Sequence, residues 1–354
     1  MTASPSSASP LQSEPGQQTA QWVVTGVRIR EVCASTLQCL VAFLVLIFLA
    51  TLARAQTPAP SQGSQDDQYT ISVSVNMVVL SATAEDHKHI PVSGLGKDDF
   101  QIYEDGVLQA IKQFSHEDIP VTVGLVIDNS GSMKTKRADV IAAALAFARS
   151  SNPKDQMFVV NFNEKVSLGL PDNTSFTDQV AQLEVALSEI AADGETALYD
   201  AIAVALEHLK KGTRDKKVLI VISDGGDNAS QHKLADIMAL AGQPDATIYT
   251  IGIFDEQNED RNPGVLRRLA KDTGGEAFLP ESLKEVAPIC ERIAHDIRNQ
   301  YTLAYVPTNK KRDGVYRTIQ VKVSAPGRGQ LLVRTRTGYF APLTLPPIAV
   351  GERP

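Results

Sequence analysis

Alternating apolar and polar positions predict that the folded part of the chain begins with β-strands. From Ile71 to Val79 every second residue is apolar, which is the period of a strand with one buried face. Residues 99–109 hold two short apolar segments on either side of Glu104-Asp105-Gly106, and this arrangement predicts a hairpin whose turn needs a positive φ. We therefore expect residues 69–118 to be mostly strand.

From Val121 onward, short apolar segments alternate with segments of helical period. We expect strands at 121–127, 157–162, 217–223 and 247–253, and helices at 138–149, 177–190, 197–209, 234–241, 264–269 and 286–297. The segment 217–223 has almost no polar interruption, which is typical of a strand buried on both faces. The alternation predicts an α/β domain with a doubly wound, mostly parallel sheet covered by helices on both sides.

Strand patterns return after Asn299, at 301–306, 316–323 and 330–336. Strand-rich flanks on both sides of the α/β unit could form two small modules, or one β-sandwich into which that unit is inserted. A flank of about 50 residues holds too little apolar surface to be comfortably stable alone. We therefore expect a single small β-sandwich built from N-terminal and C-terminal strands.

An apolar segment near the N-terminus has the features of an export signal. Leu40 to Leu52 is uncharged and apolar, basic residues precede it, and Ala53-Arg54-Ala55 follows as a small-x-small cleavage signature. A membrane-spanning helix needs about 20 apolar residues, so an uncleaved anchor would have to include the more polar residues 32–39. We expect cleavage, and the sequence leaves such an anchor open.

These patterns divide the chain into six parts. We expect an export signal with a long polar leader at 1–55, a linker at 56–68, a β-rich flank at 69–120, the α/β domain at 121–299, a second β-rich flank at 300–341 and a tail at 342–354. The predicted location is periplasmic or extracellular, and a membrane is involved only through an uncleaved N-terminal anchor.

Composition limits the classes of protein that fit. With 354 residues, 43% hydrophobic and 21% charged, the chain is long enough for two globular units. Its formal net charge of -7 argues against a nucleic-acid partner. Cys33 and Cys39 precede the predicted cleavage point, so the mature chain would keep only Cys290 and could form no internal disulfide.

The segment Asp128-Asn129-Ser130-Gly131-Ser132 is the first candidate for chemistry. It directly follows the expected strand 121–127, so one carboxylate and two hydroxyls stand at a strand end. Oxygen ligands of this kind suit a hard divalent cation, and Gly131 allows the tight turn that brings both hydroxyls to one point. A cation held mostly by neutral oxygens keeps positive charge and should attract an acidic group from another molecule.

Two later segments supply further candidate ligands for the same cation. Thr196 ends Asp193-Gly194-Glu195-Thr196, just before an expected helix, and Asp224 ends the buried strand 217–223. Asp224 should therefore lie on the same sheet edge as Asp128, where open α/β sheets bind ligands. Helix capping is the alternative role for Asp128, Ser130 and Thr196. Glu195 and Asp227 fit solvated loop acids better than ligands.

Together these motifs resemble the von Willebrand factor A domain family, which includes the integrin I domains. The resemblance covers about residues 121–299, including Thr273-Gly274-Gly275 before the last sheet strand. The family's metal-ion-dependent adhesion site combines Asp-x-Ser-x-Ser, a threonine and an Asp-Gly pair. The resemblance implies a metal site formed by Asp128, Ser130, Ser132, Thr196 and Asp224. It also implies Mg²⁺ or Mn²⁺, with Ca²⁺ less favoured, and a protein partner that presents Asp or Glu.

The flanks extend the resemblance, and one position departs from it. Phe100 to Gly106, and the segment from Tyr316-Arg317 to Gly338-Tyr339-Phe340, are similar to a subgroup of exported bacterial A-domain proteins. Gly226 stands where relatives often carry an acidic residue after the Asp-Gly pair, and Asp227 follows it directly. The involvement of Asp227 therefore stays open.

Three functions are compatible with these residues. The first is an exported, adhesion-type protein-binding module, and the second is a structural protein of the cell envelope in which the metal only stabilises loops. The third, an aspartate-dependent phosphohydrolase, needs a second acid two residues after Asp128, where the chain has Ser130. We therefore expect no catalytic residues, no organic cofactor and no enzyme activity.

Overall fold

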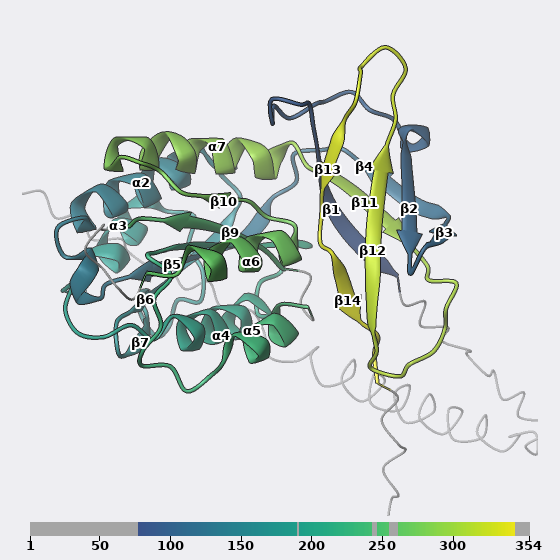
Figure 1. The fold of residues 1–354 in the computed structure, drawn as a ribbon. Helices are drawn as coiled ribbons and strands as arrows, with labels where there is room; N and C mark the ends of the chain where they lie inside the picture. The colour runs from purple at the N-terminus through teal and green to yellow at the C-terminus, as the bar shows by residue number, and fades with distance from the viewer. Residues whose placement is uncertain (1–76, 190, 243–245, 255–260, 344–354) are drawn as a thin grey trace, which may run out of the picture. The chain divides into compact units, whose positions relative to one another are not determined.

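The computed structural model describes residues 77–189, 191–242, 246–254 and 261–343 (Figure 1). The predicted export signal, the linker and residues 71–76 of the first expected strand lie outside the described residues. Within the described ranges, no helix combines the length and the apolar character that crossing a bilayer requires.

A six-stranded sheet forms the centre of the α/β domain. Its order is β10-β9-β8-β5-β6-β7, and all neighbours are parallel except β6 and β7. The strands are β5 (Val121–Asp128), β6 (Gln156–Phe162), β7 (Val166–Leu168), β8 (Lys216–Ser223), β9 (Ala246–Gly252) and β10 (Ala277–Phe278). Because β5 and β8 are neighbours, the residues that follow them meet at one edge of the sheet.

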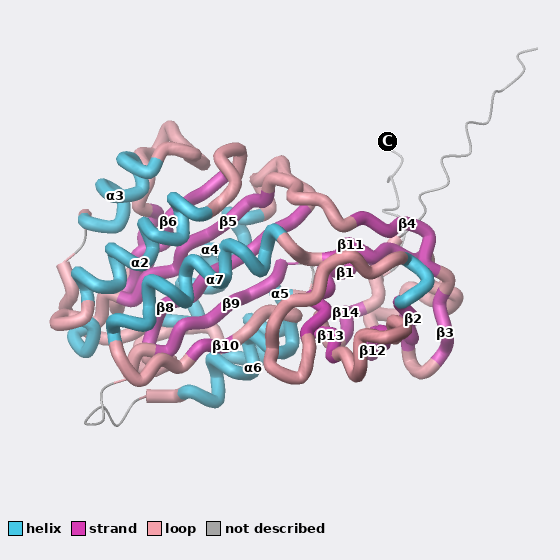
Figure 2. Tube along the Cα trace, turned by 90° about the horizontal axis from the view of Figure 1, so that it is seen from above, coloured by secondary structure: helices cyan, strands magenta, loops and turns pink. Residues whose placement is uncertain are grey.

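Helices cover both faces of this sheet (Figures 1 and 2). They are α2 (Arg137–Ser150), α3 (Val180–Ser188), α4 (Leu198–Leu209), α5 (Leu234–Ala241), α6 (Pro263–Thr273) and α7 (Val286–Arg298). Helices α2 and α7 pack together on one face, α4, α5 and α6 lie on the other, and α3 packs against α2. The predicted fold class, a doubly wound and mostly parallel α/β sheet, is confirmed.

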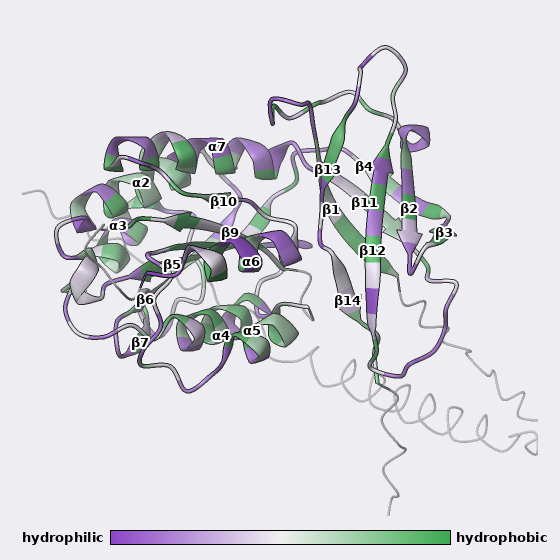
Figure 3. Ribbon diagram, viewed as in Figure 1, coloured by the Kyte–Doolittle hydropathy of each residue, from purple (hydrophilic) through white to green (hydrophobic). Residues whose placement is uncertain are grey.

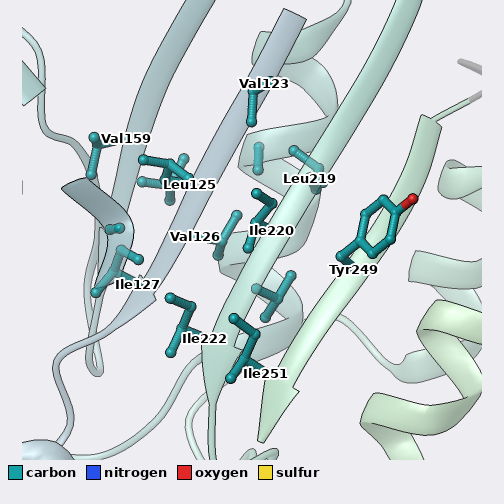
Figure 4. Close-up of a cluster of buried hydrophobic side chains, with 14 of the residues drawn as sticks. Val123, Leu125, Val126, Ile127, Val159, Leu219, Ile220, Ile222, Tyr249 and Ile251 are labelled. Atoms are coloured by element: carbon teal, nitrogen blue, oxygen red, sulfur yellow. The ribbon is translucent and has the colours of Figure 1, made fainter. Parts of the chain in front are cut away.

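The core of this domain consists of the apolar side chains of the strands and the inner helix faces (Figure 4). Every residue of β5 is buried, because helices pack on both sides of it. Gly124 lies where the two neighbouring strands crowd it, and a Cβ there would stand 2.5 Å from Phe158 and 2.6 Å from Leu219. Helix α7 carries both green and purple segments in Figure 3, as expected when one face packs on the core.

Eight strands from the two flanks form two four-stranded antiparallel sheets. One has the order β13-β1-β11-β4 and the other β14-β12-β2-β3. The strands are β1 (Val78–Glu85), β2 (Phe100–Glu104), β3 (Val107–Gln109), β4 (Ile111–Ser115), β11 (Tyr301–Tyr305), β12 (Tyr316–Val323), β13 (Leu332–Arg334) and β14 (Gly338–Phe340). Each sheet therefore combines strands from before and after the α/β domain.

The two small sheets share one hydrophobic core, as the single-sandwich prediction requires. Leu80 and Tyr301 of the first sheet and Ile102 and Ile319 of the second belong to one buried cluster. The predicted hairpin joins β2 to β3, and its turn residues Asp105 and Gly106 have φ values of 47° and 80°. A single sandwich is thus present, with the α/β domain inserted between β4 and β11.

Some boundaries differ from the sequence-based prediction. The helix expected at 177–190 begins only at Val180, because Thr177 exchanges two backbone hydrogen bonds with Met157. Helix α6 is longer than the expected 264–269, since Asn262 caps its start and Gly274, at φ 85°, ends it. Strands β7 and β14 were not predicted. Three short 3-10 helices complete the described elements: η1 (Lys97–Asp99), η2 (Gly131–Met133) and η3 (Leu283–Glu285).

A buried ionic cluster joins the sandwich to the α/β domain. The Arg334 guanidinium on β13 donates to Glu85 Oε1 and to Asp296 Oδ2, each at 2.8 Å. Tyr249 on β9 donates its hydroxyl to the same Asp296 oxygen at 2.6 Å. Burial lowers the pKa of Arg334, but the interactions with Tyr249, Asp296 and Glu85 outweigh burial and raise this pKa above its usual range. The cluster therefore keeps Arg334 charged and fixes β13 against α7.

Candidate metal centre

Asp128 is the last residue of β5 and lies at the centre of the candidate site. Its Oδ1 accepts a hydrogen bond from the backbone N–H of Ser130 at 2.8 Å, and its Oδ2 accepts one from the Ser223 hydroxyl at 2.6 Å. The pairing of Ile127 with Ile222 explains the second bond, because it places Ser223 beside Asp128. Asp128 is 2% exposed, so both oxygens are fixed by protein groups.

The loop after β5 carries the two predicted serine ligands. The Ser130 and Ser132 hydroxyl oxygens lie 3.2 Å apart, and the Ser132 hydroxyl donates to Asp224 Oδ2 at 2.7 Å. Residues 131–133 form the short η2 helix, which Met133 anchors in the core. Asp128, Ser130, Ser132 and Asp224 thus form one connected group at the carboxyl ends of β5 and β8.

The loop before α4 joins this group through its backbone. Gly194 O accepts a hydrogen bond from Gly131 N at 3.0 Å, and Asp193 N donates to Asn129 O at 2.9 Å. Gly194 adopts φ 82°, a conformation that side chains disfavour. Thr196 is buried on this loop, where its N–H donates to Asn228 Oδ1 at 2.8 Å.

Neither Ser130 nor Thr196 caps a helix with its side chain. No side chain caps α4 at its N-cap residue, and the Thr196 hydroxyl has no hydrogen-bond partner among the described residues. Likewise, the side chain of Ser130 does not cap η2, and α2 has no side-chain cap. Thr196 thus lies on a loop that is hydrogen-bonded through its backbone to the loop of Asp128 and Ser130. The structure shows no hydrogen bond between the Thr196 hydroxyl and the other predicted ligands.

Asp227 serves the start of α4. Its Oδ1 accepts hydrogen bonds from Tyr199 N at 3.2 Å and from the Ser230 hydroxyl at 2.6 Å. Partial burial raises the pKa of Asp227, and these hydrogen bonds oppose the rise. Asp227 is therefore a structural residue in this arrangement, which the sequence pattern could not distinguish from a ligand.

Burial dominates the electrostatics of the site. It raises the pKa of Asp128 to about 6, against the lowering effect of the hydrogen bonds from Ser130 and Ser223, and the nearby Asp224 raises it further. No lysine or arginine forms a salt bridge with Asp128 in the described part of the chain. The group therefore concentrates carboxylate charge that a bound cation would neutralise.

The chemistry of the donor atoms fits a hard divalent cation. Carboxylate and hydroxyl oxygens are ligands that Mg²⁺ and Mn²⁺ accept, whereas soft metals favour thiolates and imidazoles. Within the described residues, no three His, Cys, Asp or Glu side chains gather as a metal cluster. The candidate site depends instead on two carboxylates supplemented by hydroxyls.

Two residues of the site were missed from sequence. Ser223 holds Asp128, and Asn129 donates from its side chain to Ile127 O at 3.1 Å and to Asn161 Oδ1 at 3.2 Å. Each is the direct neighbour of a predicted ligand: Ser223 precedes Asp224, and Asn129 follows Asp128. The parallel register of β5 and β8 is the signal that would have indicated Ser223.

One family model matches the part of the chain that carries the candidate site. Residues 123–226 match the family model of the von Willebrand factor type A domain. This segment is therefore similar to the von Willebrand factor type A domain. The five candidate ligands all fall inside the matched range.

Two curated relatives match about half of the chain. An uncharacterized protein of Synechocystis is 25% identical over 173 residues, which are 47% of this chain and 39% of the relative. Inter-alpha-trypsin inhibitor heavy chain H4 of Sus scrofa is 26% identical over 200 residues, which are 50% of this chain and 21% of the relative. This chain thus matches less than half the length of either relative.

Several solved structures are similar to this chain. A von Willebrand factor type A protein from Catenulispora acidiphila is 16% identical with a TM-score of 0.47, and the match covers 70% of this chain and 74% of that one. The A domain of the type V pili tip protein Mfa5 from Porphyromonas gingivalis is 15% identical with a TM-score of 0.43, covering 51% and 95%. Proximal thread matrix protein 1 from the mussel byssus, with a zinc-occupied MIDAS motif, is 16% identical with a TM-score of 0.43, covering 51% and 49%.

Proposed function

We propose that this protein is an exported binding module whose A domain captures an acidic side chain of a partner protein through a divalent cation. Asp128, Ser130, Ser132, Thr196 and Asp224 would hold the cation, which we take to be Mg²⁺ or Mn²⁺. The observation that carries the proposal is the chain of hydrogen bonds from Asp128 through Ser223 and from Ser132 to Asp224. It brings oxygen donors from loops far apart in sequence to one sheet edge.

A bound cation would supply positive charge, and this charge would attract a carboxylate of the partner. The protein's own residues would orient that charge. Ser223 and the Ser130 N–H hold the Asp128 carboxylate, while the N–H of Gly226 donates to Asp224 Oδ1 at 3.1 Å. Because these contacts are made before any partner arrives, little rearrangement of the site is needed on binding.

Two other functions are weaker candidates. In a structural envelope protein the metal would only stabilise the loops, and partner binding would survive the loss of Asp128. A phosphohydrolase reading lacks a general acid, because Ser130 stands two residues after Asp128 and has no acidic proton. Neither alternative explains why two carboxylates and two serine hydroxyls meet at one sheet edge.

The proposal includes the organisation of the whole chain. Residues 1–55 would direct export, 56–68 would link the signal to the folded region, and 69–120 with 300–341 would provide the sandwich around the A domain at 121–299. The tail would be 342–354. The protein would then act in the periplasm or outside the cell.

The decisive experiment is a capture assay with the immobilised protein and an extract of the cell envelope. We expect one or more proteins to be retained in Mg²⁺ and released by a chelator. Asp128→Ala should abolish this retention, whereas Asp172→Ala, which changes an exposed aspartate away from the site, should not. Retention that survives both the chelator and Asp128→Ala would favour the structural role.

A further inference from the structure

Four exposed apolar side chains lie at one end of the β14-β12-β2-β3 sheet, where β12 begins and the chain leaves β14. Val315, Tyr316, Phe340 and Leu343, here called the apolar patch, are between 41% and 64% exposed. Tyr316 pairs with Phe340 across the two strands, and their ring centroids lie 5.1 Å apart. Beyond this pair, an isolated bridge joins Asp313 to Leu343. The four side chains thus stand on two adjoining segments, and grouped apolar side chains of this kind mark a contact surface.

A basic loop adjoins the apolar patch. The loop 306–315 joins β11 to β12 at the same end of the sandwich (Figure 1), and its Lys310, Lys311 and Arg312 are exposed. Its single acid, Asp313, lies 3.6 Å from the Arg317 guanidinium. Within the described residues, no salt bridge involves Lys310 or Lys311. The loop therefore presents net positive charge beside the patch.

The buried Arg317 of β12 holds this loop in place. Its guanidinium donates to the backbone oxygens of Asn309 and Lys311, each at 2.6 Å, and also pairs with the buried Glu104. Because the loop is bound through its backbone, the lysine side chains are not used to hold it. The bases and the apolar patch are thus positioned before any contact, which reduces the entropy lost on docking.

We propose that this end of the sandwich docks on an anionic membrane surface. The apolar patch would enter the headgroup region, and Lys310 and Lys311 would pair with lipid phosphates. Buried apolar area and attraction to anionic lipids are the two contributions that hold a protein at a bilayer surface, and this end of the sandwich supplies both. The run of bases favours a lipid surface over a protein partner, because an anionic bilayer presents phosphates wherever the bases meet it.

This inference goes beyond the proposed function. The docking residues belong to the sandwich and include none of the candidate metal ligands. Docking would therefore need no bound cation, and it would hold the protein at a membrane while the α/β domain binds a partner.

The test is co-sedimentation with vesicles in the presence of a chelator. The probes are vesicles of phosphatidylcholine alone and vesicles of phosphatidylcholine and phosphatidylglycerol in equal amounts. The protein is the chain from residue 56 onward, the mature form under the proposed export, which contains every described residue and lacks the apolar segment 40–52. We expect binding to the anionic vesicles to be about tenfold tighter or more, and the difference should shrink at ~1 M salt.

Charge-neutral variants locate the basic contribution. The double variant Lys310→Gln, Lys311→Gln should weaken binding to the anionic vesicles about tenfold. The matched control is Lys210→Gln, Lys211→Gln, which removes the same charge from an exposed lysine pair at the end of α4. The control should bind as the unchanged protein does.

A second pair of variants locates the apolar contribution. Leu343→Ser should weaken binding several-fold, because it removes the most exposed side chain of the apolar patch. Leu332→Ser is the control, since Leu332 is also exposed but lies on β13 of the other small sheet. It should leave vesicle binding unchanged.

The outcomes decide the inference without deciding the proposed function. Absence of binding, equal binding to both kinds of vesicle, or equal effects of the two lysine pairs would overturn the membrane docking. Binding that requires Mg²⁺ would also overturn it, because the metal would then bridge the protein to the phosphates. If the Lys310 and Lys311 variant loses proteins from the envelope extract while the unchanged chain ignores vesicles, this surface binds a protein and the inference fails.

Discussion

The Ser132 hydroxyl donates a hydrogen bond to the Asp224 carboxylate at 2.7 Å, across 92 positions of the chain. The reverse relationship also exists, because the Ser223 hydroxyl beside Asp224 donates to Asp128 at 2.6 Å. Asp224, which follows β8, is therefore held by a hydroxyl from the loop after β5, and Asp128, which ends β5, is held by a hydroxyl from β8. The loss of either acid should disturb both loops.

The first prediction concerns metal and thermal stability. Millimolar Mg²⁺ or Mn²⁺ should raise the melting temperature, since a ligand that binds only the folded state stabilises it by about 2.7 kcal/mol at a hundredfold excess over Kd. Asp224→Ala should abolish the gain, and the exposed Asp172→Ala should keep it. Differential scanning calorimetry measures the effect. Identical melting curves with and without metal would contradict the proposed site.

The second prediction concerns the pH dependence that arises from Asp155. Its carboxylate accepts hydrogen bonds from Val121 N at 2.8 Å and Asn152 N at 3.1 Å, yet burial raises its pKa to about 6 from the ordinary 3.8. Between these values the folded state holds a proton that the unfolded state releases. The contribution of Asp155 to the free energy of unfolding therefore falls as pH rises through this window.

Asp155→Asn tests this sign. The variant should lose about 1 kcal/mol from one poorer hydrogen bond, and its stability relative to the wild type should improve as pH rises from 3.8 to about 6. Urea unfolding at several pH values measures the difference, with Asp172→Asn as the exposed control. A gap between variant and wild type that stays constant over the window would disprove the assignment.

The third prediction concerns the ionic cluster between the sandwich and α7. Arg334→Met should cost about 3 to 5 kcal/mol, because Glu85 and Asp296 would stay buried without their cation. Arg298→Met is the control, since that arginine pairs with Asp118 at the surface and should contribute about 0 to 1 kcal/mol. Denaturant unfolding compares them. Similar losses for both variants would show that the cluster adds nothing beyond a surface pair.

The fourth prediction concerns the single thiol of the folded region. Cys290 is fully buried on α7, and burial raises the pKa of its thiol to about 12. In a chain carrying Cys33→Ser and Cys39→Ser, a thiol reagent at neutral pH should therefore react only after denaturant unfolds the protein. Absorbance of the released reagent follows the reaction. Labelling of the native chain at the unfolded rate would rule out this burial.

Much of the fold follows from local patterns. The strand at β8 was predicted because parallel strands buried on both faces are continuously apolar. The hairpin of β2 and β3 was predicted because its turn contains Asp105-Gly106, and both residues do have a positive φ in the structure. Strand β7 has only three residues, two partly buried and one exposed, which is too short a segment to show a period. The start of α3 was misplaced because the backbone of Thr177 pairs with Met157, a contact that no local pattern encodes.

The site shows the same division. Asp128 and Asp224 could be brought together from sequence, since both end buried strands of a parallel sheet. The roles of Ser223 and Asp227 could not, because each is decided by a partner far away in the chain. Ser223 depends on the register with β5, and Asp227 on the position of Tyr199 at the start of α4.

The pairing of Ser115 with Thr302 has a consequence for how such a protein can be rebuilt. Ser115 is the last residue of β4 and Thr302 is the second residue of β11, so the chain leaves the sandwich and returns to it on adjacent strands about 4.8 Å apart. A short turn could replace the whole α/β domain without altering the order of the eight sandwich strands. Recombination could likewise exchange one binding module for another on an unchanged frame.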